Sequence, residues 1–352
     1  IDPNGLNVGQ FGNRNLIING AMQVAQRGTS ETGVNVGTFH TVDRFQYAEG
    51  SGGGSGALTE SQSTEAPDGF ANSFKFEVTT TDTLSGGENV LVRTRLEGQD
   101  LQRFKFGTSA AEKMTVSFFV RASETGTYGL QIMIGPASNE SAMQSYTVNS
   151  ANTWEYKTIT FDGSTSYSIP NNSSRGFDLN FMLDCGPDDL TSPYGFTTTG
   201  AFRAPTGQVN FMQTSGNTWQ ITGLQLEVGD TATPFEHISF GDQLQKCMRY
   251  YQFISGMIGV AATSTQVNCS VLLPTVMRAA PTMAKTGSNI NFGDMVSFGD
   301  DSSSTPSIIS YLYKEMAVGF SINGFSGFTT YRSYRHEPQG SVAGRITLDA
   351  EL

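Results

Sequence analysis

Short runs of alternating apolar and polar residues recur along most of this 352-residue chain, and turn-forming residues separate them. Six such runs are NSFKFEVTT at 72–80, MTVSFFVRAS at 114–123, YGLQIMIG at 128–135, TWEYKTITF at 153–161, FDLNFMLDCG at 177–186 and TWQITGLQLEVG at 218–229. A period of two buries one set of side chains and leaves the other in water, which is typical of antiparallel β-strands. The pattern predicts an all-β fold whose first domain, residues 15–236, is a jelly-roll β-sandwich.

Two glycine-rich stretches interrupt the early part of the chain. Residues 1–14 are rich in Gly and Asn and predict an N-terminal arm. GSGGGSG at 50–56 has no side chain that can pack, so we expect a mobile surface loop, and strand signals resume directly at Ala57. Because the sequence begins at Ile1 and not at Met, we expect a piece of a longer polypeptide or added first residues.

The segment QLEVGDTATPFEHISFGDQLQKCMRYYQ at 225–252 breaks the β-pattern. Ser239 followed by Asp242 is similar to a helix capping box, so residues 237–254 predict a short helical joint. A helix of about 14 residues is marginal alone, so its apolar stripe must pack on something. That stripe consists of Phe240, Leu244, Met248 and Tyr251.

The β-pattern returns after this joint. VNCSVLLP at 267–274, PSIISYLYKEMAVGF at 306–320 and FTTYRSYRH at 328–336 are strand candidates. Residues 255–352 therefore predict a smaller C-terminal β-domain.

Charge and cysteine usage exclude several classes of protein. The 21 basic and 32 acidic residues give a net charge of −11, which argues against a nucleic-acid partner and against docking on anionic lipid. No apolar run reaches the roughly 18 residues that span a bilayer, and no signal peptide is visible, so we expect no membrane insertion. Neither disulfides nor a zinc site is expected, because three cysteines and three histidines are scattered without metal-ligand spacing. The cysteines are Cys185, Cys247 and Cys269, and the histidines are His40, His237 and His336.

Several motifs together resemble bacteriophage tail-fibre and receptor-binding proteins, and the resemblance runs from about Asn15 to Leu352. They are NLIINGAMQVAQRGTS at 15–30, HTVDRFQY at 40–47, the 225–252 segment, VLLPTVMRAAPT at 271–282 and ITLDAEL at 346–352. The first β-domain also resembles the jelly-roll carbohydrate-binding modules of glycoside hydrolases, through MTVSFFVRAS and the strand from Trp154 to Phe161.

The resemblance implies a non-enzymatic virion protein, assembled in the host cytoplasm as a homotrimer within a tail fibre. Its partners would be other virion proteins and host cell-surface polysaccharide. In a trimer, three helices would pack their apolar stripes about one axis, and the C-terminal domain would form the tip and a trimer contact. Packing of each helix on its own jelly roll stays open. The other functions that stay open are a capsid-attached fibre or decoration protein and a polysaccharide-degrading enzyme.

An enzyme is the less favoured reading. No GxSxG, HExxH or P-loop motif is present, so we expect no catalytic residues and no cofactor. A glycosidase with two paired carboxylates stays open, because its acids can lie far apart in sequence.

The densest cluster of basic and aromatic residues lies in TTYRSYRHEPQ at 329–339, and it is the candidate glycan-binding segment. Tyr rings stack on sugar rings, and Arg and His bind anionic groups on a glycan. The candidates are Tyr331, Arg332, Tyr334, Arg335 and His336. In an extended segment Arg332, Tyr334 and His336 share one face, and we expect that face outward because it holds two basic groups. The alternative is a strand with Arg paired to acids and Tyr in an interface.

For three further groups of residues we favour a structural role over a binding role. Trp154 and Trp219 lie in alternating strands, so we expect core positions rather than sugar platforms. Asp43 and Arg44 are expected to form a structural ion pair or close a turn. The acids Asp184, Asp188 and Asp189 lie within six residues and offer a weak candidate for a structural Ca²⁺ site, against a solvated acidic turn.

Overall fold

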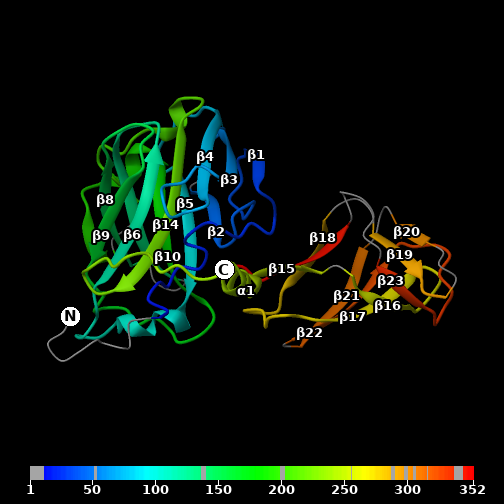
Figure 1. Ribbon diagram of the computed structural model, residues 1–352. Helices are drawn as coiled ribbons and strands as arrows, with labels where there is room; N and C mark the ends of the chain where they lie inside the picture. Colours follow the sequence, from blue (N-terminus) through cyan, green and yellow to red (C-terminus); the bar gives the residue numbers. More distant parts are fainter. Residues whose placement is uncertain are drawn as a thin grey trace. The chain divides into compact units, whose positions relative to one another are not determined.

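The computed structural model describes residues 12–50, 54–135, 140–198, 203–254, 256–286, 290–296, 300–303, 307–314, 316–336 and 344–352. Strands dominate it, and the chain forms two compact units (Figure 1). The first contains the residues up to Gln243 together with Leu352, and the second contains Leu244–Glu351. The predicted all-β fold is confirmed. The expected arm and the centre of the glycine-rich loop, residues 1–11 and 51–53, lie outside the described residues.

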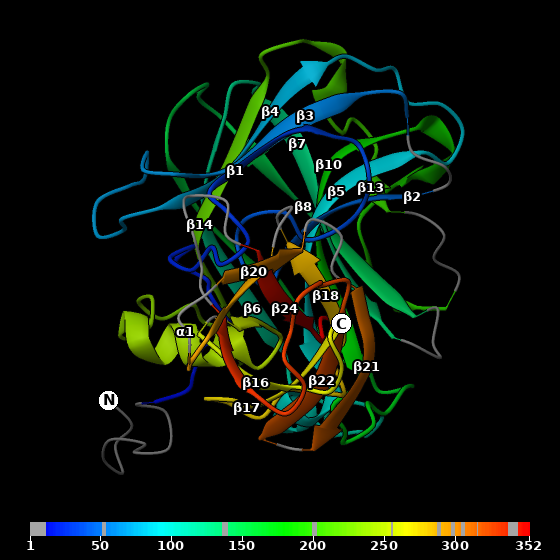
Figure 2. The ribbon, with the colours of Figure 1, turned by 90° about the vertical axis from the view of Figure 1, so that its right-hand side faces the viewer.

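The first unit is a sandwich of two six-stranded antiparallel sheets, and Figure 2 shows their strands as two layers. In order across sheet A the strands are β1 (Ser30–Val34), β3 (Ala57–Ser63), β4 (Ser73–Thr80), β14 (Thr218–Val228), β6 (Met114–Ala122) and β9 (Glu155–Phe161). Across sheet B they are β12 (Tyr194–Thr197), β8 (Ser141–Val148), β7 (Gly126–Ile134), β10 (Arg175–Cys185), β5 (Asn89–Glu97) and β2 (Phe45–Gly50). Strands far apart in sequence are neighbours, as the jelly-roll prediction requires.

Alternation builds the core of this unit. Along β6 the residues Met114, Val116, Phe118 and Val120 are all buried, while the intervening positions face outward. Phe118 meets Phe181 of β10 edge to face at 5.1 Å, so the core joins the two sheets.

Short elements complete the unit. They are the 3₁₀ turns η2 (Gly98–Phe104), η3 (Pro187–Asp189) and η4 (Phe211–Gln213), and the parallel pair β11 (Leu190–Thr191) and β13 (Ala204–Pro205). All three cysteines of the chain are free and buried.

The predicted helix exists but is shorter than expected. Helix α1 spans Phe240–Met248, and Ser239 caps it, since the Ser239 Oγ accepts from the backbone N–H of Asp242 at 3.2 Å and donates to its carboxylate at 2.6 Å. The chain then enters β15 (Tyr251–Ile254), so Tyr251 lies in a strand and not on the helix. The division between the two units falls inside α1, within the predicted joint 237–254.

The second unit contains two antiparallel sheets of its own. The smaller has the order β15, β24 (Arg345–Asp349), β18 (Thr282–Thr286). The larger has the order β20 (Asp300–Ser303), β19 (Ile290–Asp294), β23 (Ser333–His336), β16 (Ile258–Ala261), β17 (Gln266–Leu272), β22 (Ala317–Asn323), β21 (Ser307–Lys314). Its core is separate from that of the first unit and includes Phe292, Phe320 and Tyr334.

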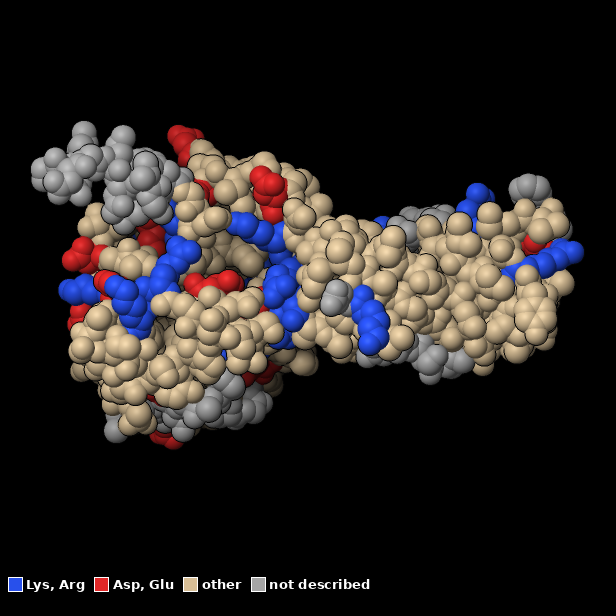
Figure 3. Space-filling model, turned by 90° about the horizontal axis from the view of Figure 1, so that it is seen from below, with Lys and Arg blue, Asp and Glu red and all other residues tan. Residues whose placement is uncertain are grey.

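Charge is unevenly displayed on the surface. On the face drawn in Figure 3, basic and acidic side chains of the first unit stand next to one another around a hollow, and the second unit shows few of either. The net negative charge is therefore not a uniform acidic field. No helix among the described residues is long and apolar enough to cross a membrane.

Candidate functional site

The outer face of sheet A, which points away from the core, carries two neighbouring rows of side chains. Directly opposite residues of antiparallel strands share a face. The register therefore aligns Arg121 of β6, Gln220 of β14 and Lys75 of β4 in one polar row. Phe119 is opposite Tyr156 of β9 and stands two residues from Arg121, so an aromatic row runs beside the polar one.

Rings continue the aromatic row across the sheet. Tyr156 and Phe119 have centroids 5.0 Å apart, and Phe119 lies 5.6 Å from Phe70, which comes from the loop between β3 and β4. Phe70 in turn lies 5.0 Å from Phe235 and 5.2 Å from His237. Tyr156 is 48% exposed and His237 is exposed, whereas the three Phe rings are half-buried. We call these five residues the aromatic row.

A glycine in β14 makes this row possible. Gly223 lies where the pairing of β14 with β6 is irregular, between Thr222 and Gln225, and its φ is +61°. A Cβ there would stand 2.7 Å from the ring of Phe70 and 3.1 Å from the ring of Phe119. Only glycine combines this conformation with that space, so Phe70 can reach across the backbone of β14.

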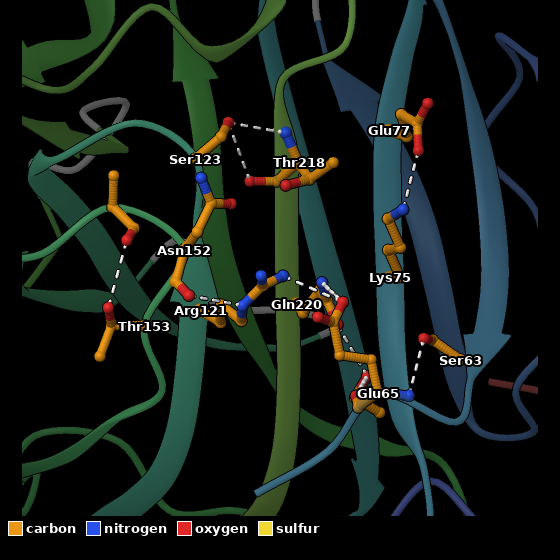
Figure 4. A network of polar contacts seen from close by, with 12 residues as sticks. Ser63, Glu65, Lys75, Glu77, Arg121, Ser123, Asn152, Thr153, Thr218 and Gln220 are labelled. Atoms are coloured by element: carbon orange, nitrogen blue, oxygen red, sulfur yellow. Dashed lines mark hydrogen bonds and ion pairs between the residues drawn. The ribbon is translucent and has the colours of Figure 1, made fainter.

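Beside the rings, a hydrogen-bonded group of polar residues is fixed in place (Figure 4). The carboxylate of Glu65 accepts from Nη1 of Arg121 at 3.0 Å and from Nε2 of Gln220 at 2.9 Å. Arg121 also donates from Nε to the carbonyl of Asn152 at 2.9 Å. Ser73 donates to Oε1 of Gln220 at 3.1 Å. We call Glu65, Arg121, Asn152 and Gln220 the polar network. Gln220 is fully buried and holds Glu65 in place, so Glu65, Arg121 and Asn152 are the members that a ligand can reach.

Charges in this region are paired. Arg121 pairs with Glu65, and Lys75 pairs with Glu77 at 2.8 Å. An uncharged ligand therefore suits this face better than an anion or a cation.

The edge strand β9 is anchored beside the rings. Glu155, between Trp154 and Tyr156, accepts from the backbone N–H groups of Asn149 at 2.8 Å and Ser150 at 2.7 Å, and Lys157 donates to it at 2.6 Å. Burial acts to raise the pKa of Glu155, but these hydrogen bonds outweigh it and lower the pKa to about 2. The start of β9 is therefore held rigidly at neutral pH.

The two tryptophans have different environments. Trp219 is fully buried and donates to the hydroxyl of Tyr146 at 3.2 Å, which confirms its predicted core position. Trp154 is only half-buried, directly before β9, so the core prediction is wrong for it. It is two residues from Tyr156 and so has the same side-chain direction, and β9 is the last strand in the described part of sheet A.

The candidate glycan segment in the second unit alternates between buried and exposed residues as predicted, but the face expected outward is the buried one. Tyr334 and His336 are buried, so the prediction that they point outward is wrong. The Tyr334 ring packs 4.4 Å from Phe328, and its hydroxyl accepts from the N–H of Thr329 at 2.8 Å. His336 lies 3.1 Å from the carbonyl of Gly344, and burial lowers its pKa.

The other members of that segment are nearer the surface. Arg332 pairs with Asp294 at 2.8 Å, which is the alternative reading of this residue. Tyr331 is 86% exposed with a left-handed φ of +67°, and Arg335 is exposed. Tyr331 and Arg335 are therefore the members of the segment whose side chains are exposed.

The predicted helix stripe is not the buried side of α1. Phe240 is 56% exposed, and Leu244 and Met248 are half-buried. The buried helix residues are instead Gln243 and Cys247. Packing of three copies on the stripe stays a prediction.

The three acids proposed for calcium do not converge. Asp184 is buried and accepts from the backbone N–H groups of Cys185 at 2.8 Å and Met212 at 2.7 Å, while Asp189 lies 3.4 Å from Arg203. Asp188 takes part in neither arrangement. No group of three His, Cys, Asp or Glu in the described part of the chain is placed to hold a metal ion. The calcium prediction is therefore wrong, because each buried acid is turned toward its own partner.

Asp43 and Arg44 have a structural role, as predicted. Both are buried in a turn before β2, with Arg44 at φ +71°. Asp43 accepts from the N–H of Gln26 at 2.9 Å, and Arg44 donates to the carbonyl of Arg95 at 2.6 Å. They close the turn and tie it to β5.

A pocket of about 400 Å³ lies at the start of the described chain, lined in part by Arg14, Arg103, Glu227 and Asp230. Arg14 donates to Thr233 at 2.6 Å, and the same Thr233 donates its N–H to Glu227 at 3.0 Å. These groups bind one another, and they fasten the segment at Arg14 to the one after β14.

Sequence reasoning missed the aromatic row, although part of its signal was present. In MTVSFFVRAS the outward phase reads Thr, Ser, Phe, Arg, so Phe119 stands out, as Trp154 and Tyr156 do in TWEYKTITF. The other members come from loops, where no alternation of apolar and polar residues predicts which way a side chain points. They are Phe70, Phe235 and His237.

Comparison with known proteins adds little to this geometry. No family model and no curated protein matches the chain. Among solved structures, the enzymatically active domain of bacteriophage CBA120 tailspike protein 4 is similar at 11% identity and a TM-score of 0.31, over 61% of this chain. The match takes in 21% of the tailspike chain, so this chain spans about a fifth of its length.

Two carbohydrate-binding modules are similar to the same extent. A CBM4 structure matches at 13% identity and a TM-score of 0.28, over 60% of this chain and 97% of the module. The family 11 module from Clostridium thermocellum, in complex with a β-1,3-1,4-mixed-linked tetrasaccharide, matches at 11% identity and a TM-score of 0.29, over 59% and 98%. At these TM-scores none of the likenesses carries an argument about this chain.

Proposed function

We propose that the chain is a non-enzymatic saccharide-binding protein of a bacteriophage virion, and that the outer face of sheet A binds a neutral saccharide. The observation that carries the binding proposal is the aromatic row beside the polar network on the outer face of one sheet. Aromatic rings stack on the apolar face of a pyranose, and fixed polar side chains exchange hydrogen bonds with its hydroxyl groups.

Each part of this face has a distinct task in the proposal. Tyr156, at 48% exposure, offers a ring at the edge of the sheet, and Trp154 offers a second ring close by. Arg121 is already oriented by Glu65, and the buried Gln220 holds Glu65 in turn, so little side-chain entropy is lost when a sugar hydroxyl replaces water at Arg121.

Virion location and trimeric assembly rest on the sequence resemblance to tail-fibre and receptor-binding proteins. A trimer would bring three such faces to one host surface, and weak single contacts then act together through effective concentration. Tyr331 and Arg335 of the second unit are proposed as an additional contact with the host glycan.

The main alternative is a polysaccharide-degrading enzyme, and one experiment separates it from a binder. The protein is run through native gels that contain one neutral soluble polysaccharide each, and the same polysaccharides are assayed for new reducing ends. We expect retarded migration in at least one gel without release of reducing ends. Release of reducing ends would show an enzyme, and unretarded migration in every gel would reject saccharide binding by this face.

A further inference from the structure

Arginines gather on the outer face of the other sheet, sheet B. Arg93 and Arg95 are two residues apart on β5 and share a face, and the register places Asn180 and Asp178 of β10 directly opposite them. Two further guanidinium groups, one at the start of β10 and one beside β13, are close enough to influence Arg93 electrostatically. We call the four residues Arg93, Arg95, Arg175 and Arg203 the arginine cluster.

The cluster holds more positive charge than its partners neutralise. Asp178 is shared by Arg95 at 3.2 Å and Arg175 at 3.3 Å. Arg203 pairs with Asp189 at 3.4 Å. Arg93 donates from Nε to the neutral side-chain amide of Gln46 at 3.0 Å, and no described carboxylate lies within ion-pair distance of it. Arg93 is therefore the guanidinium of the cluster without a carboxylate partner among the described residues, in a chain whose net charge is −11.

Burial makes this excess charge costly. Burial first, and then the neighbouring guanidinium of Arg95, lowers the pKa of Arg93 to about 10. The pKa of Arg95 is lowered as well, again first by burial. A bound anion would compensate charge that water reaches poorly, so its attraction to Arg93 is stronger than on an open surface.

Unused hydrogen-bonding atoms mark the same place. Asn180 is 2% exposed and donates to Gln131 at 3.1 Å, but its Oδ1 has no hydrogen-bond partner. The buried Nε of Arg175 also lacks one. A buried polar atom without a partner is costly, and a sugar hydroxyl that donates to Oδ1 of Asn180, directly opposite Arg93, would remove that cost there.

We propose that the arginine cluster binds the oxyanionic substituent of an acidic saccharide, a carboxylate or a phosphate. The outer N–H groups of Arg93 hold the anion in a fork, with Arg175 and Arg203 beside it, and a sugar hydroxyl donates to Oδ1 of Asn180. Arg95 is not a donor to this ligand, because it already donates to the backbone oxygen of Leu352 in the same unit.

This site is distinct from the aromatic row, which lies on the other sheet and has paired charges. That the anion is carried by a saccharide rests on the proposed function, whereas the binding of an oxyanion rests on the cluster alone. A nucleic acid is the less suitable ligand, since the acidic chain as a whole repels a polyanion.

The test is calorimetric titration of the whole chain with trigalacturonate, its carboxyl-reduced counterpart and inorganic phosphate. We expect trigalacturonate to bind at least tenfold more tightly than the reduced sugar, and to weaken as salt rises. Arg93→Gln should weaken binding of trigalacturonate at least tenfold, because the forked, charge-assisted contact is lost. Lys113→Gln, which removes an exposed charge elsewhere on the unit, is the matched control and should bind as the parent does.

The outcomes separate this inference from the proposed function. Equal binding of trigalacturonate by Arg93→Gln and the parent, with both proteins folded by circular dichroism, would overturn the site. Preference for phosphate over both sugars would overturn the saccharide part. Arg93→Gln should leave the retardation by neutral polysaccharide unchanged, so loss of acidic-sugar binding alone points to the cluster. Arg203→Gln, at a side chain that is 29% exposed, repeats the test if Arg93→Gln fails to fold.

Discussion

Glu60 places a carboxyl group in the core of the first unit without a cation bound to it. Its Oε1 accepts from the N–H and the hydroxyl of Thr41 at 2.9 and 2.7 Å, and its Oε2 has no partner. Burial raises the pKa of Glu60 to about 7, from 4.5, although the bonds from Thr41 act to lower it. The folded state thus binds a proton that the unfolded state releases. Stability from this group is greatest below about pH 4.5 and is lost as the pH rises to about 7.

The first prediction follows from this loss of stability with rising pH. Glu60→Gln keeps the acceptor for Thr41 and removes the ionisation, so the variant should gain stability relative to the parent between pH 5 and pH 8. Urea unfolding of both proteins at these two pH values measures the difference. An equal stability difference at both pH values would contradict the raised pKa.

The second prediction separates the two tyrosines of the candidate glycan segment. Tyr334→Ala should cost about 3 kcal/mol of unfolding free energy, because it empties a buried site beside Phe328. Tyr331→Ala should change it by less than about 0.5 kcal/mol, because that side chain is in water. Denaturant unfolding of the two variants checks the difference, and equal losses would mean that Tyr331 is also packed.

At the scale of the element, alternation was the reliable guide. It predicted β6, β9 and β14, and it identified β23 as a strand. It did not show which face of β23 points outward, because alternation alone does not distinguish the two faces of a strand. We chose the face with Arg332 and His336 because charged groups need hydration, and that criterion was wrong. Partners from the loop before β23 decided it, since Phe328 packs on the ring of Tyr334 and Thr329 donates to its hydroxyl.

Element lengths and loop contributions were less predictable. In the sequence the helical period continues through Tyr251, but in the structure Tyr251 belongs to β15, which pairs with β24. The aromatic row depends on Phe70 and Phe235, which loops deliver, and on an irregular pairing at Gly223, for which a single sequence has no signal. Long-range contacts of this kind are set by tertiary packing.

The third prediction concerns Gly223. Gly223→Ala should destabilise the chain by ~1–3 kcal/mol more than Gly216→Ala, because the added methyl meets Phe70 and Phe119. Gly216 is the matched control, since its φ is +84° but a Cβ there meets no atom within 4 Å. Chemical unfolding of both variants gives the comparison. Equal losses would show that Phe70 moves aside freely.

At the scale of the whole molecule, the open question is assembly. The fourth prediction is a homotrimer, with a solution mass about three times 37.9 kDa by light scattering. Phe240→Asp should lower this mass without unfolding the chain, because Phe240 is 56% exposed within one copy. Gln245→Asp, at an exposed position off the predicted stripe, should leave the mass unchanged. A parent mass of one chain would contradict the trimer.

The most direct test of the central claim, that the outer face of sheet A binds a neutral saccharide, is affinity electrophoresis of Tyr156→Ala. In the polysaccharide that retards the parent, the variant should bind about fivefold more weakly, since one aromatic stacking contact is worth ~1 kcal/mol. Tyr156→Phe, which keeps the ring, and Val36→Ala, which trims an exposed side chain elsewhere on the unit, should be retarded as the parent is. Retardation of Tyr156→Ala equal to that of the parent would contradict the claim.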